Sequence, residues 1–300
     1  HMKLLLHGKK FSKNIGEQII KFIDKLIFEN HKIIYTESFF QLIQKRTSKY
    51  NNKLINTINS IDKSQQNIDY IICFGGDGTI LDAATLVKNT EIPIVGINTG
   101  RLGFLATISK NEISTLMHYL KNKKYSLSNR TLLEIQAENT KLSFPFALNE
   151  ISVSSKENSS MINIQVFLNN EYLNTYWADG LIISTPTGST GYSLSCGGPI
   201  VMPKSNNFII TPIAPHNLNV RPLVISDDNV IRLKITDNNN SRKFLLSMDS
   251  RNEYLKKGTC ITVKKASYNI KLLELLSATY SQTIREKLLW GLDNRNYELL

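Results

Sequence analysis

Hydrophobic residues in the first 124 positions form short continuous runs that alternate with stretches of helical spacing. The spacing from Ile15 to Ile27 predicts a helix, and the polar stretch from Thr47 to Asn67 predicts part helix and part loop. The run at 70–74 is continuous, as in a strand that is buried on both faces of a parallel sheet. The runs that predict strands lie at 4–6, 32–35, 70–74 and 94–97. This alternation predicts an α/β domain with a Rossmann-like parallel sheet.

The pattern changes after about Tyr125 to many short runs, several of which alternate with period two. Such runs, separated by turn residues, predict an all-β domain. These runs lie at 132–135, 144–148, 162–167, 181–183, 230–235 and 261–263. Helical spacing returns at 281–290. We therefore expect an α/β domain at 2–125, a β-rich domain at 126–275, and a C-terminal helical extension at 276–300 that packs back on the first domain.

A glycine-rich turn, Gly75-Gly76-Asp77-Gly78-Thr79, joins the predicted strand at 70–74 to a predicted helix. Free backbone N–H groups and the positive end of the helix dipole meet at such a junction, where phosphate binds readily. Thr79 is expected to cap this helix, with Asp82 completing the capping box. Asp77 is unusual, because a carboxylate repels a phosphate. Its presence indicates that it accepts a proton from, or orients, an attacking hydroxyl, or that it meets the magnesium of a nucleotide. The alternative is an Asp-Gly turn without chemistry.

Several other chemistries are disfavoured by the sequence. It contains no P-loop motif, no protein-kinase signature set and no third glycine of a dinucleotide redox fingerprint. Its cysteines, Cys73, Cys196 and Cys260, lack the spacing of a zinc site or a disulfide framework. We therefore predict no protein-held metal.

A second segment, from Asp179 to Pro199, is rich in small hydroxyl side chains and glycine. Hydroxyl groups beside exposed backbone N–H groups read the polar edges of a base and a ribose, and the Tyr192 ring offers a surface on which adenine stacks. Such clusters are also common in ordinary loops. The length of this one, and the glycines at 197 and 198, favour a nucleotide-binding role.

Together these motifs resemble the NAD kinase family. The matching segments are 75–79, 96–105, 149–150, 179–199 and 221–223. The resemblance implies transfer of the γ-phosphoryl of ATP, or of polyphosphate, to the 2′-hydroxyl of the adenosine ribose of NAD, with magnesium bound to ATP. Asp77 would then be the catalytic proton acceptor. The residues that the resemblance implies for NAD binding are Asp77, Gly78, Asn149, Glu150, Asp179, Thr190, Gly191, Tyr192, Ser193, Leu194, Ser195 and Arg251.

Three residues depart from the pattern of that family. Gly191 stands where alanine is usual, Trp177 where arginine is frequent, and Arg251 where glutamine is common. All three lie where contacts with the dinucleotide are expected. If position 191 is helical, its glycine destabilises the helix by about 0.5–1 kcal/mol. The alternatives to an NAD kinase are a lipid kinase of the diacylglycerol or sphingosine type and a non-catalytic NADP sensor.

Charge and hydropathy set the expected surroundings. The net charge is +11, but the lysines are spread through polar stretches without interleaved aromatic residues, so we predict no nucleic-acid partner. No apolar run approaches the roughly 20 residues that span a bilayer, and we predict a cytoplasmic protein without a membrane partner. The resemblance implies that the β-rich domain at 126–275 is a dinucleotide-binding and oligomerisation domain. It also implies a homodimer or homotetramer, in which Asp179 reaches across a subunit interface.

Overall fold

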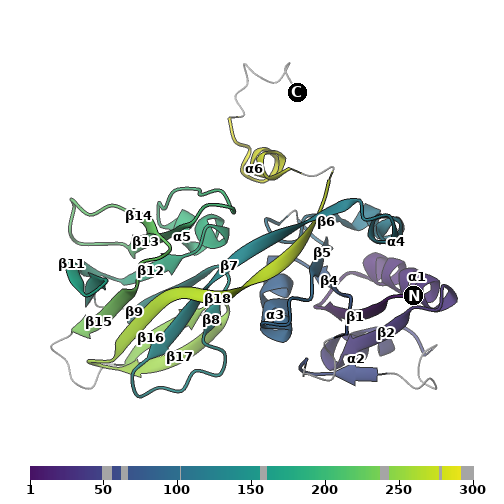
Figure 1. The fold of residues 1–300 in the computed structure, drawn as a ribbon, viewed down its shortest axis with the longest axis horizontal. Helices are drawn as coiled ribbons and strands as arrows, with labels where there is room; N and C mark the ends of the chain where they lie inside the picture. The colour runs from purple at the N-terminus through teal and green to yellow at the C-terminus, as the bar shows by residue number, and fades with distance from the viewer. Residues whose placement is uncertain are drawn as a thin grey trace. The chain divides into compact units, whose positions relative to one another are not determined.

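The computed structural model describes residues 1–48, 56–61, 67–101, 103–155, 161–236, 243–276 and 279–291. The chain forms two compact units: residues 1–128 with 270–300 are unit 1, and residues 129–269 are unit 2. Two long strands, β7 (Tyr125–Ala137) and β18 (Cys260–Leu275), pair with each other, and each contains residues of both units (Figure 1).

Unit 1 is built on a parallel sheet in the order β3-β2-β1-β4-β5. Its strands are β1 (Lys3–Gly8), β2 (Lys32–Thr36), β3 (Asn56–Ile58), β4 (Tyr70–Gly75) and β5 (Ile94–Asn98), and β5 also pairs with β6 (Ile108–Ser109) and with Leu272. The chain order reverses between β1 and β4. The carboxyl ends of these two strands are therefore the topological switch point at which open α/β sheets bind ligands.

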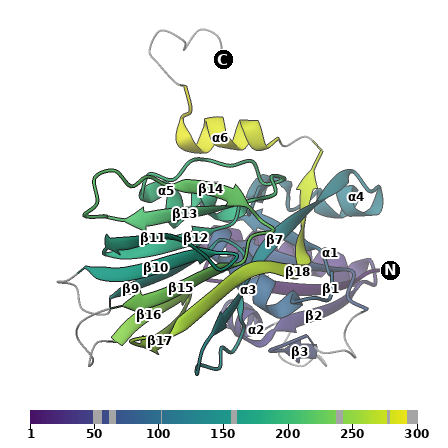
Figure 2. The same cartoon turned by 60° about the vertical axis from the view of Figure 1, so that its left-hand side comes forward.

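Helices cover this sheet because their apolar residues face it. The core shared with alternate strand residues such as Leu4, Leu6 and Ile72 takes in α1, α2 and α4, and Figure 2 shows α1 along β1 and β2. Helix α3 contacts β5 where Gly96 leaves space: a Cβ there would lie 2.8 Å from Ile80 Cδ1. The helices of unit 1 are α1 (Lys13–Phe28), α2 (Glu37–Gln44), α3 (Asp77–Val87), α4 (Leu116–Lys121) and α6 (Tyr280–Leu288), with a 3₁₀ turn η2 (Lys110–Glu112).

Unit 2 is a β-sandwich. One sheet has the antiparallel order β14-β13-β12-β9-β16-β17, and the other contains β11-β10-β15-β18 with β7 and β8. Residues of both sheets, for example Val153 and Ile164, share one apolar core. The strands are β8 (Phe146–Ala147), β9 (Glu150–Ser155), β10 (Ile162–Leu168), β11 (Glu171–Ala178), β12 (Gly180–Ser184), β13 (Asn207–Ile213), β14 (Leu223–Ser226), β15 (Ile231–Thr236), β16 (Lys243–Met248) and β17 (Arg251–Lys256).

The predicted fold class is confirmed. Each predicted strand overlaps an observed strand, and the helices predicted at 15–27, after the glycine-rich turn and at 281–290 overlap α1, α3 and α6. The polar stretch 47–67 is the exception: its described part contains β3, which pairs with β2, and most of the remainder lies outside the described residues. Helix α2 was not predicted, because its few apolar residues immediately follow a strand. No helix in the part of the chain that the structure describes is long and apolar enough to cross a membrane.

Candidate active site

The glycine-rich turn lies directly after β4, at the switch point of the unit 1 sheet. Helix α3 begins at Asp77 with Gly76 as its N-cap, so the predicted cap at Thr79 is wrong. Thr79 lies buried in the first turn, where a Cβ on Gly75 would be 2.0 Å from its hydroxyl oxygen. Asp82 instead pairs with Lys9 at 2.6 Å. The predicted box failed because the helix begins three residues earlier than the spacing indicated.

Asp77 is held by backbone N–H groups from a distant segment. Its Oδ2 accepts a hydrogen bond from Phe104 N at 2.9 Å, and its Oδ1 accepts from Leu105 N at 3.0 Å and Ala106 N at 3.1 Å. Gly103 is needed for this approach, because a Cβ at that position would lie 1.9 Å from Asp77 Oδ1. The three donors explain how a carboxylate is accommodated in a phosphate-binding turn: the backbone compensates its charge.

The space beside Asp77 is open on one side and cationic on another. A Cβ added at Gly76 or Gly78 would meet no heavy atom within 4 Å. Lys287 of α6 places its Nζ 3.7 Å from Asp77 Oδ2. The turn therefore combines an uncrowded helix N-terminus, a fixed carboxylate and an ammonium group, which together suit a phosphate and a reacting hydroxyl.

The Asn149-Glu150 pair in unit 2 is fixed from two sides. Asp249 accepts backbone hydrogen bonds from Leu148 N (2.9 Å), Asn149 N (2.8 Å) and Glu150 N (3.3 Å). The Thr185 hydroxyl donates to Leu148 O at 2.6 Å. A Cβ on the glycine at 188 would lie 2.0 Å from Asn149 O, so only glycine fits there. The backbone of the pair is thus locked, and its side chains are left for other partners.

Those side chains carry unused polar atoms. Asn149 Oδ1 and Glu150 Oε2 are both buried and have no hydrogen-bond partner among the described residues. Burial raises the pKa of Glu150 to about 7, and the Asp249 charge adds to the rise, while the hydrogen bond from Tyr192 N opposes it. Burial also raises the pKa of Asp249. Buried polar atoms without partners are costly in a finished core, so these two indicate a ligand that completes their hydrogen bonds.

The hydroxyl-rich segment forms a 3₁₀ turn, η3 (Thr187–Thr190), and a short helix, α5 (Tyr192–Ser195). Gly191 lies between the two and is not helical, so the helix penalty that the sequence raised does not apply. A Cβ there would be 2.8 Å from Glu150 Oε2, which places Gly191 against the predicted ligand-binding pair.

Side chains of this segment point in different directions. The Tyr192 ring is exposed. Its pKa is raised, first by the partial burial of the side chain and then by the nearby Cys196 and Asp179. Asp179 is exposed as well. Ser193 is fully buried and its hydroxyl bonds to Thr211 Oγ1 at 2.8 Å, which supports the loop. Thr190, Leu194 and Ser195 are at least partly exposed beside Gly191 and Tyr192, and their binding roles stay predictions.

Two of the residues that depart from the family pattern have contacts within unit 2. Arg251 donates from Nη1 to Phe144 O and from Nη2 to Phe146 O, and its guanidinium lies over the Phe144 ring at 4.8 Å. Its contribution to NAD binding stays a prediction, but these contacts show it tying down the chain before Asn149. Trp177 packs against His216, with ring centroids 4.1 Å apart and the ring planes tilted by 39°.

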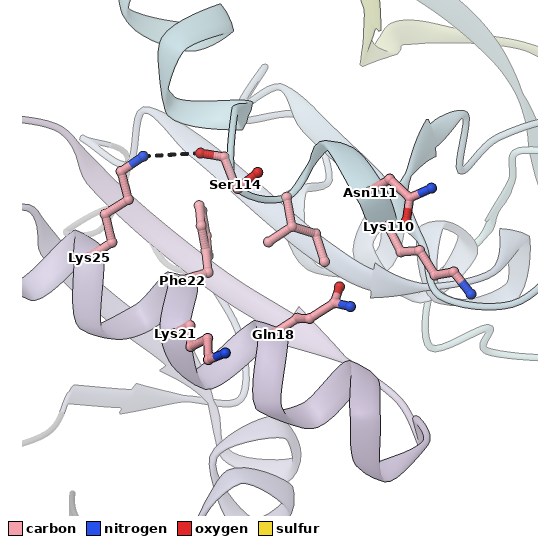
Figure 3. Close-up of a pocket in the computed structure, with 8 residues that line it drawn as sticks. Gln18, Lys21, Phe22, Lys25, Lys110, Asn111 and Ser114 are labelled. Carbon is pink, nitrogen blue, oxygen red and sulfur yellow. Dashed lines mark hydrogen bonds between the residues drawn. The ribbon is translucent and has the colours of Figure 1, made fainter.

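No group of three or more His, Cys, Asp or Glu residues in the described ranges is placed to hold a metal ion. A cavity of about 400 Å³ in unit 1 lies between α1 and the segment 110–114 (Figure 3). Its lining contains none of the predicted site residues, and its polar groups are mostly surface lysines, amides and a serine. Its residues are Gln18, Lys21, Phe22, Lys25, Lys110, Asn111, Ile113 and Ser114.

Three parts of the site were missed by reasoning from the sequence. The donors to Asp77 are backbone groups, which have no residue signature, although the segment 96–105 was recognised as a motif. Leu102 of that motif lies outside the described residues. Asp249 was not singled out from the sequence, and Lys287 sits in a helix whose spacing carried no chemical signal.

Comparison with protein families gives two matches in chain order. Residues 12–125 match the ATP-NAD kinase N-terminal domain, and residues 148–275 match the ATP-NAD kinase C-terminal domain. A relative from Flavobacterium johnsoniae, named NAD kinase, is 46% identical over 98% of this chain and 100% of its own. Another relative of that name, from Porphyromonas gingivalis strain W83, is 40% identical over 96% of this chain and 98% of its own.

Solved structures show the same fold. Yeast NADH kinase, crystallised with NADH, superposes with a TM-score of 0.86 and 25% identity, over 97% of this chain and 89% of the other. An NAD kinase from Archaeoglobus fulgidus superposes with a TM-score of 0.70 and 24% identity, over 97% and 98% of the two chains.

Proposed function

The chain belongs to the NAD kinase family, and from that premise we propose that it transfers the γ-phosphoryl group of ATP to the 2′-hydroxyl of the adenosine ribose of NAD. A new bond forms between the ribose O2′ and phosphorus. The bond from phosphorus to the bridging oxygen breaks, and its electron pair leaves with ADP. The hydroxyl proton passes to Asp77, and the products are NADP and ADP.

The hydrogen bonding of Asp77 is the observation that carries this proposal. A carboxylate offers about four acceptor positions, two on each oxygen. Among the described residues, Oδ1 accepts two N–H groups and Oδ2 accepts one, so the remaining position is on Oδ2. A carboxylate held in one orientation with one acceptor position left is suited to align a hydroxyl and take its proton.

The unsatisfied atoms of unit 2 support recognition of the dinucleotide. Asn149 Oδ1 and Glu150 Oε2 would accept hydrogen bonds from the amino group of adenine or from ribose hydroxyls, and the exposed Tyr192 ring would stack on the base. The likeness to a yeast enzyme crystallised with NADH favours a dinucleotide ligand. We propose that Gly78, Asp179, Thr190, Gly191, Ser193, Leu194, Ser195 and Arg251 complete or support this binding surface.

Magnesium would enter with the phosphate donor. Mg²⁺ usually keeps several waters and binds through substrate phosphates with one or two carboxylates. This fits a chain whose described residues form no acidic cluster and whose Asp77 is largely occupied by backbone donors. The ion would neutralise charge on the donor phosphates, and Asp77 would remain the residue that handles the proton.

A coupled assay that detects NADP tests the proposal directly. The purified chain is offered NAD with ATP and Mg²⁺, NAD with polyphosphate and Mg²⁺, and diacylglycerol with ATP and Mg²⁺. NADP formed with ATP supports the proposal, and NADP formed with polyphosphate adds that donor. Tight NADP binding without turnover under either donor would favour the sensor alternative, and phosphorylation of the lipid alone would reject the proposal.

We also infer self-association into a homodimer or homotetramer. Unit 2 exposes large apolar side chains, including Trp177 at 44% and Leu218 at 88% of their surface, which suit a protein interface. Multi-angle light scattering of the purified chain would give the mass, and a monomer across the working concentration range would reject the inference.

A further inference from the structure

Helix α6 sets one face against the segment that holds Asp77. Tyr280 and Lys287 are two turns apart and therefore lie on the same side of the helix. The Tyr280 and Phe104 ring centroids are 6.0 Å apart, and Lys287 Nζ lies 4.6 Å from the centroid of the same Phe104 ring. The Lys287 ammonium therefore lies over the Phe104 ring, in a defined place beside Asp77.

The distance between Lys287 and Asp77 shows whether the ammonium is bound to the carboxylate or left for another partner. At 3.7 Å, Nζ is too far from Oδ2 for a hydrogen bond, so the ammonium donors are not spent on the carboxylate. Oδ2 is also the oxygen that keeps an open acceptor position among the described residues. The hydroxyl that Asp77 would align and the Lys287 ammonium thus belong to the same small space.

Phosphoryl transfer needs positive charge at this place. Charge spreads over the equatorial oxygens of the transferring group, and fixed cations beside them lower the barrier. The chain has no P-loop lysine, and Lys9, which reaches α3, is already paired with Asp82 at 2.6 Å. Lys287 is about one-third exposed and therefore remains reachable by a substrate.

We propose that Lys287 is a catalytic residue of this phosphoryl transfer, and that its ammonium binds the transferring phosphoryl group beside Asp77. The inference rests on the proposed function. As the bond from O2′ to phosphorus forms and the bond to the ADP oxygen breaks, Lys287 keeps its protons and only donates hydrogen bonds. Lys287 lies beyond both segments that match the family domains, so those matches assign it no role.

The competing explanation is a structural ion pair that merely docks α6. Lys287→Met separates the two, because it keeps an unbranched stem against Phe104 and removes the charge. Arg285→Met is the matched control: it changes the net charge equally on the same helix, at an exposed position two residues away that faces elsewhere. Lys287→Arg restores a cation. The readouts are kcat, KM for NAD, KM for ATP and the melting temperature of each variant.

Loss of a transition-state donor costs on the order of 10²-fold in kcat, and we expect that loss in Lys287→Met with KM for NAD unchanged and Arg285→Met near the wild type. Equal turnover in the two variants, faster turnover in Lys287→Met, or an effect confined to KM for NAD would overturn the inference. If Lys287→Met melts below Arg285→Met, Lys287→Arg decides: recovered turnover supports the inference, and turnover as low as in Lys287→Met overturns it.

The wild-type assay keeps the two proposals apart. A wild type that forms no NADP removes the proposed function, whatever the variants do. An active wild type with an equally active Lys287→Met leaves the proposed function standing and removes only the role of Lys287.

Discussion

Each of the two units contains a carboxylate that the sequence singled out for the site, and the structure treats Asp77 and Glu150 in opposite ways. Asp77 in unit 1 accepts three backbone N–H groups and has an ammonium nearby. Glu150 in unit 2 is mostly buried beside the Asp249 carboxylate, and its Oε2 has no partner among the described residues. Both oxygens of Asp77 accept backbone hydrogen bonds that fix the orientation of the carboxylate. Glu150 instead keeps a buried oxygen without a hydrogen-bond partner among the described residues. This contrast matches the two proposed roles, in which Asp77 takes part in the chemistry and Glu150 recognises the dinucleotide.

The largest expected effect on this contrast comes from the substitution Asp77→Asn. An amide has no carboxylate oxygen to take the proton, and its NH₂ would face a backbone N–H in the position of one oxygen. We expect kcat to fall by about 10²–10⁴-fold, while the dissociation constant for NAD changes by less than about threefold. Steady-state kinetics and calorimetric titration with NAD measure the two quantities. Unchanged turnover would remove Asp77 from the chemistry, and lost NAD binding would erase the division between the carboxylates.

The second test moves Asp77 without changing it. In Gly103→Ala the new Cβ would lie 1.9 Å from Oδ1, so the carboxylate must leave its N–H donors or the segment must shift. A misplaced catalytic group costs on the order of 10²-fold, which we expect in kcat. Gly100→Ala is the matched control, since a Cβ there meets nothing within 4 Å. Equal activity of the two variants would show that the orientation of Asp77 is unimportant.

These two positions show how far the sequence reached. The continuous apolar run at 70–74 and the glycines after it were enough to predict a buried strand, a turn and a phosphate site, because each depends on local pattern. The donors to Asp77 lie 27 to 29 residues away and are backbone groups, so no residue type announces them. The cap at Thr79 failed for a related reason: where a helix begins depends on such tertiary hydrogen bonds as well as on spacing.

Unit 2 gives the same lesson. Asn149 and Glu150 were identified by resemblance to a family, and the unsatisfied atoms now give that choice a physical reason. Asp249 anchors the pair through three backbone N–H groups from about 100 residues away, a contact that only the folded chain brings together. The sequence also could not show that Arg251 hydrogen-bonds backbone carbonyls, because a guanidinium at the start of a strand suits either a ligand or a neighbouring strand.

The third prediction concerns the pH dependence of stability through Glu150. Its pKa is about 7 in the folded protein against an ordinary 4.5. Below pH 4.5 both states are protonated. Between about pH 4.5 and pH 7 the unfolded state has lost the Glu150 proton while the folded state keeps it. The free energy of unfolding therefore falls as pH rises, by about 3 kcal/mol once pH exceeds 7. Glu150→Gln does not ionise and should avoid this loss.

Urea unfolding at pH 5 and pH 8 measures that difference. We expect Glu150→Gln to gain stability over the wild type at pH 8 and little at pH 5. Glu171→Gln, an exposed position in the same unit, makes the same charge change and should gain nothing at either pH. A pH-independent gain in Glu150→Gln would mean that lost ionisation is not the cause. It would also weaken the view of Glu150 as a strained group that awaits a ligand.

The smallest effect on stability is expected from Gly191→Ala, whose new Cβ would contact the Glu150 carboxyl group. The φ of Gly191 is −93°, outside the left-handed region that favours glycine, so we expect the pH-independent change in stability to stay within about 1 kcal/mol. The new Cβ would lie 2.8 Å from Glu150 Oε2, the far end of a side chain that can shift. Displacement of the carboxyl group toward solvent would reduce its burial, so part of the pH dependence should disappear.

A double-mutant cycle isolates this interaction. The pH-dependent effect of Gly191→Ala should vanish in the Glu150→Gln background, while any pH-independent effect of alanine should remain. If Gly191→Ala alters the pH dependence equally in both backgrounds, its effect does not pass through Glu150. The substitution at position 191 would then act only through the backbone. The absence of a side chain at Gly191 would not explain why Glu150 Oε2 has no hydrogen-bond partner.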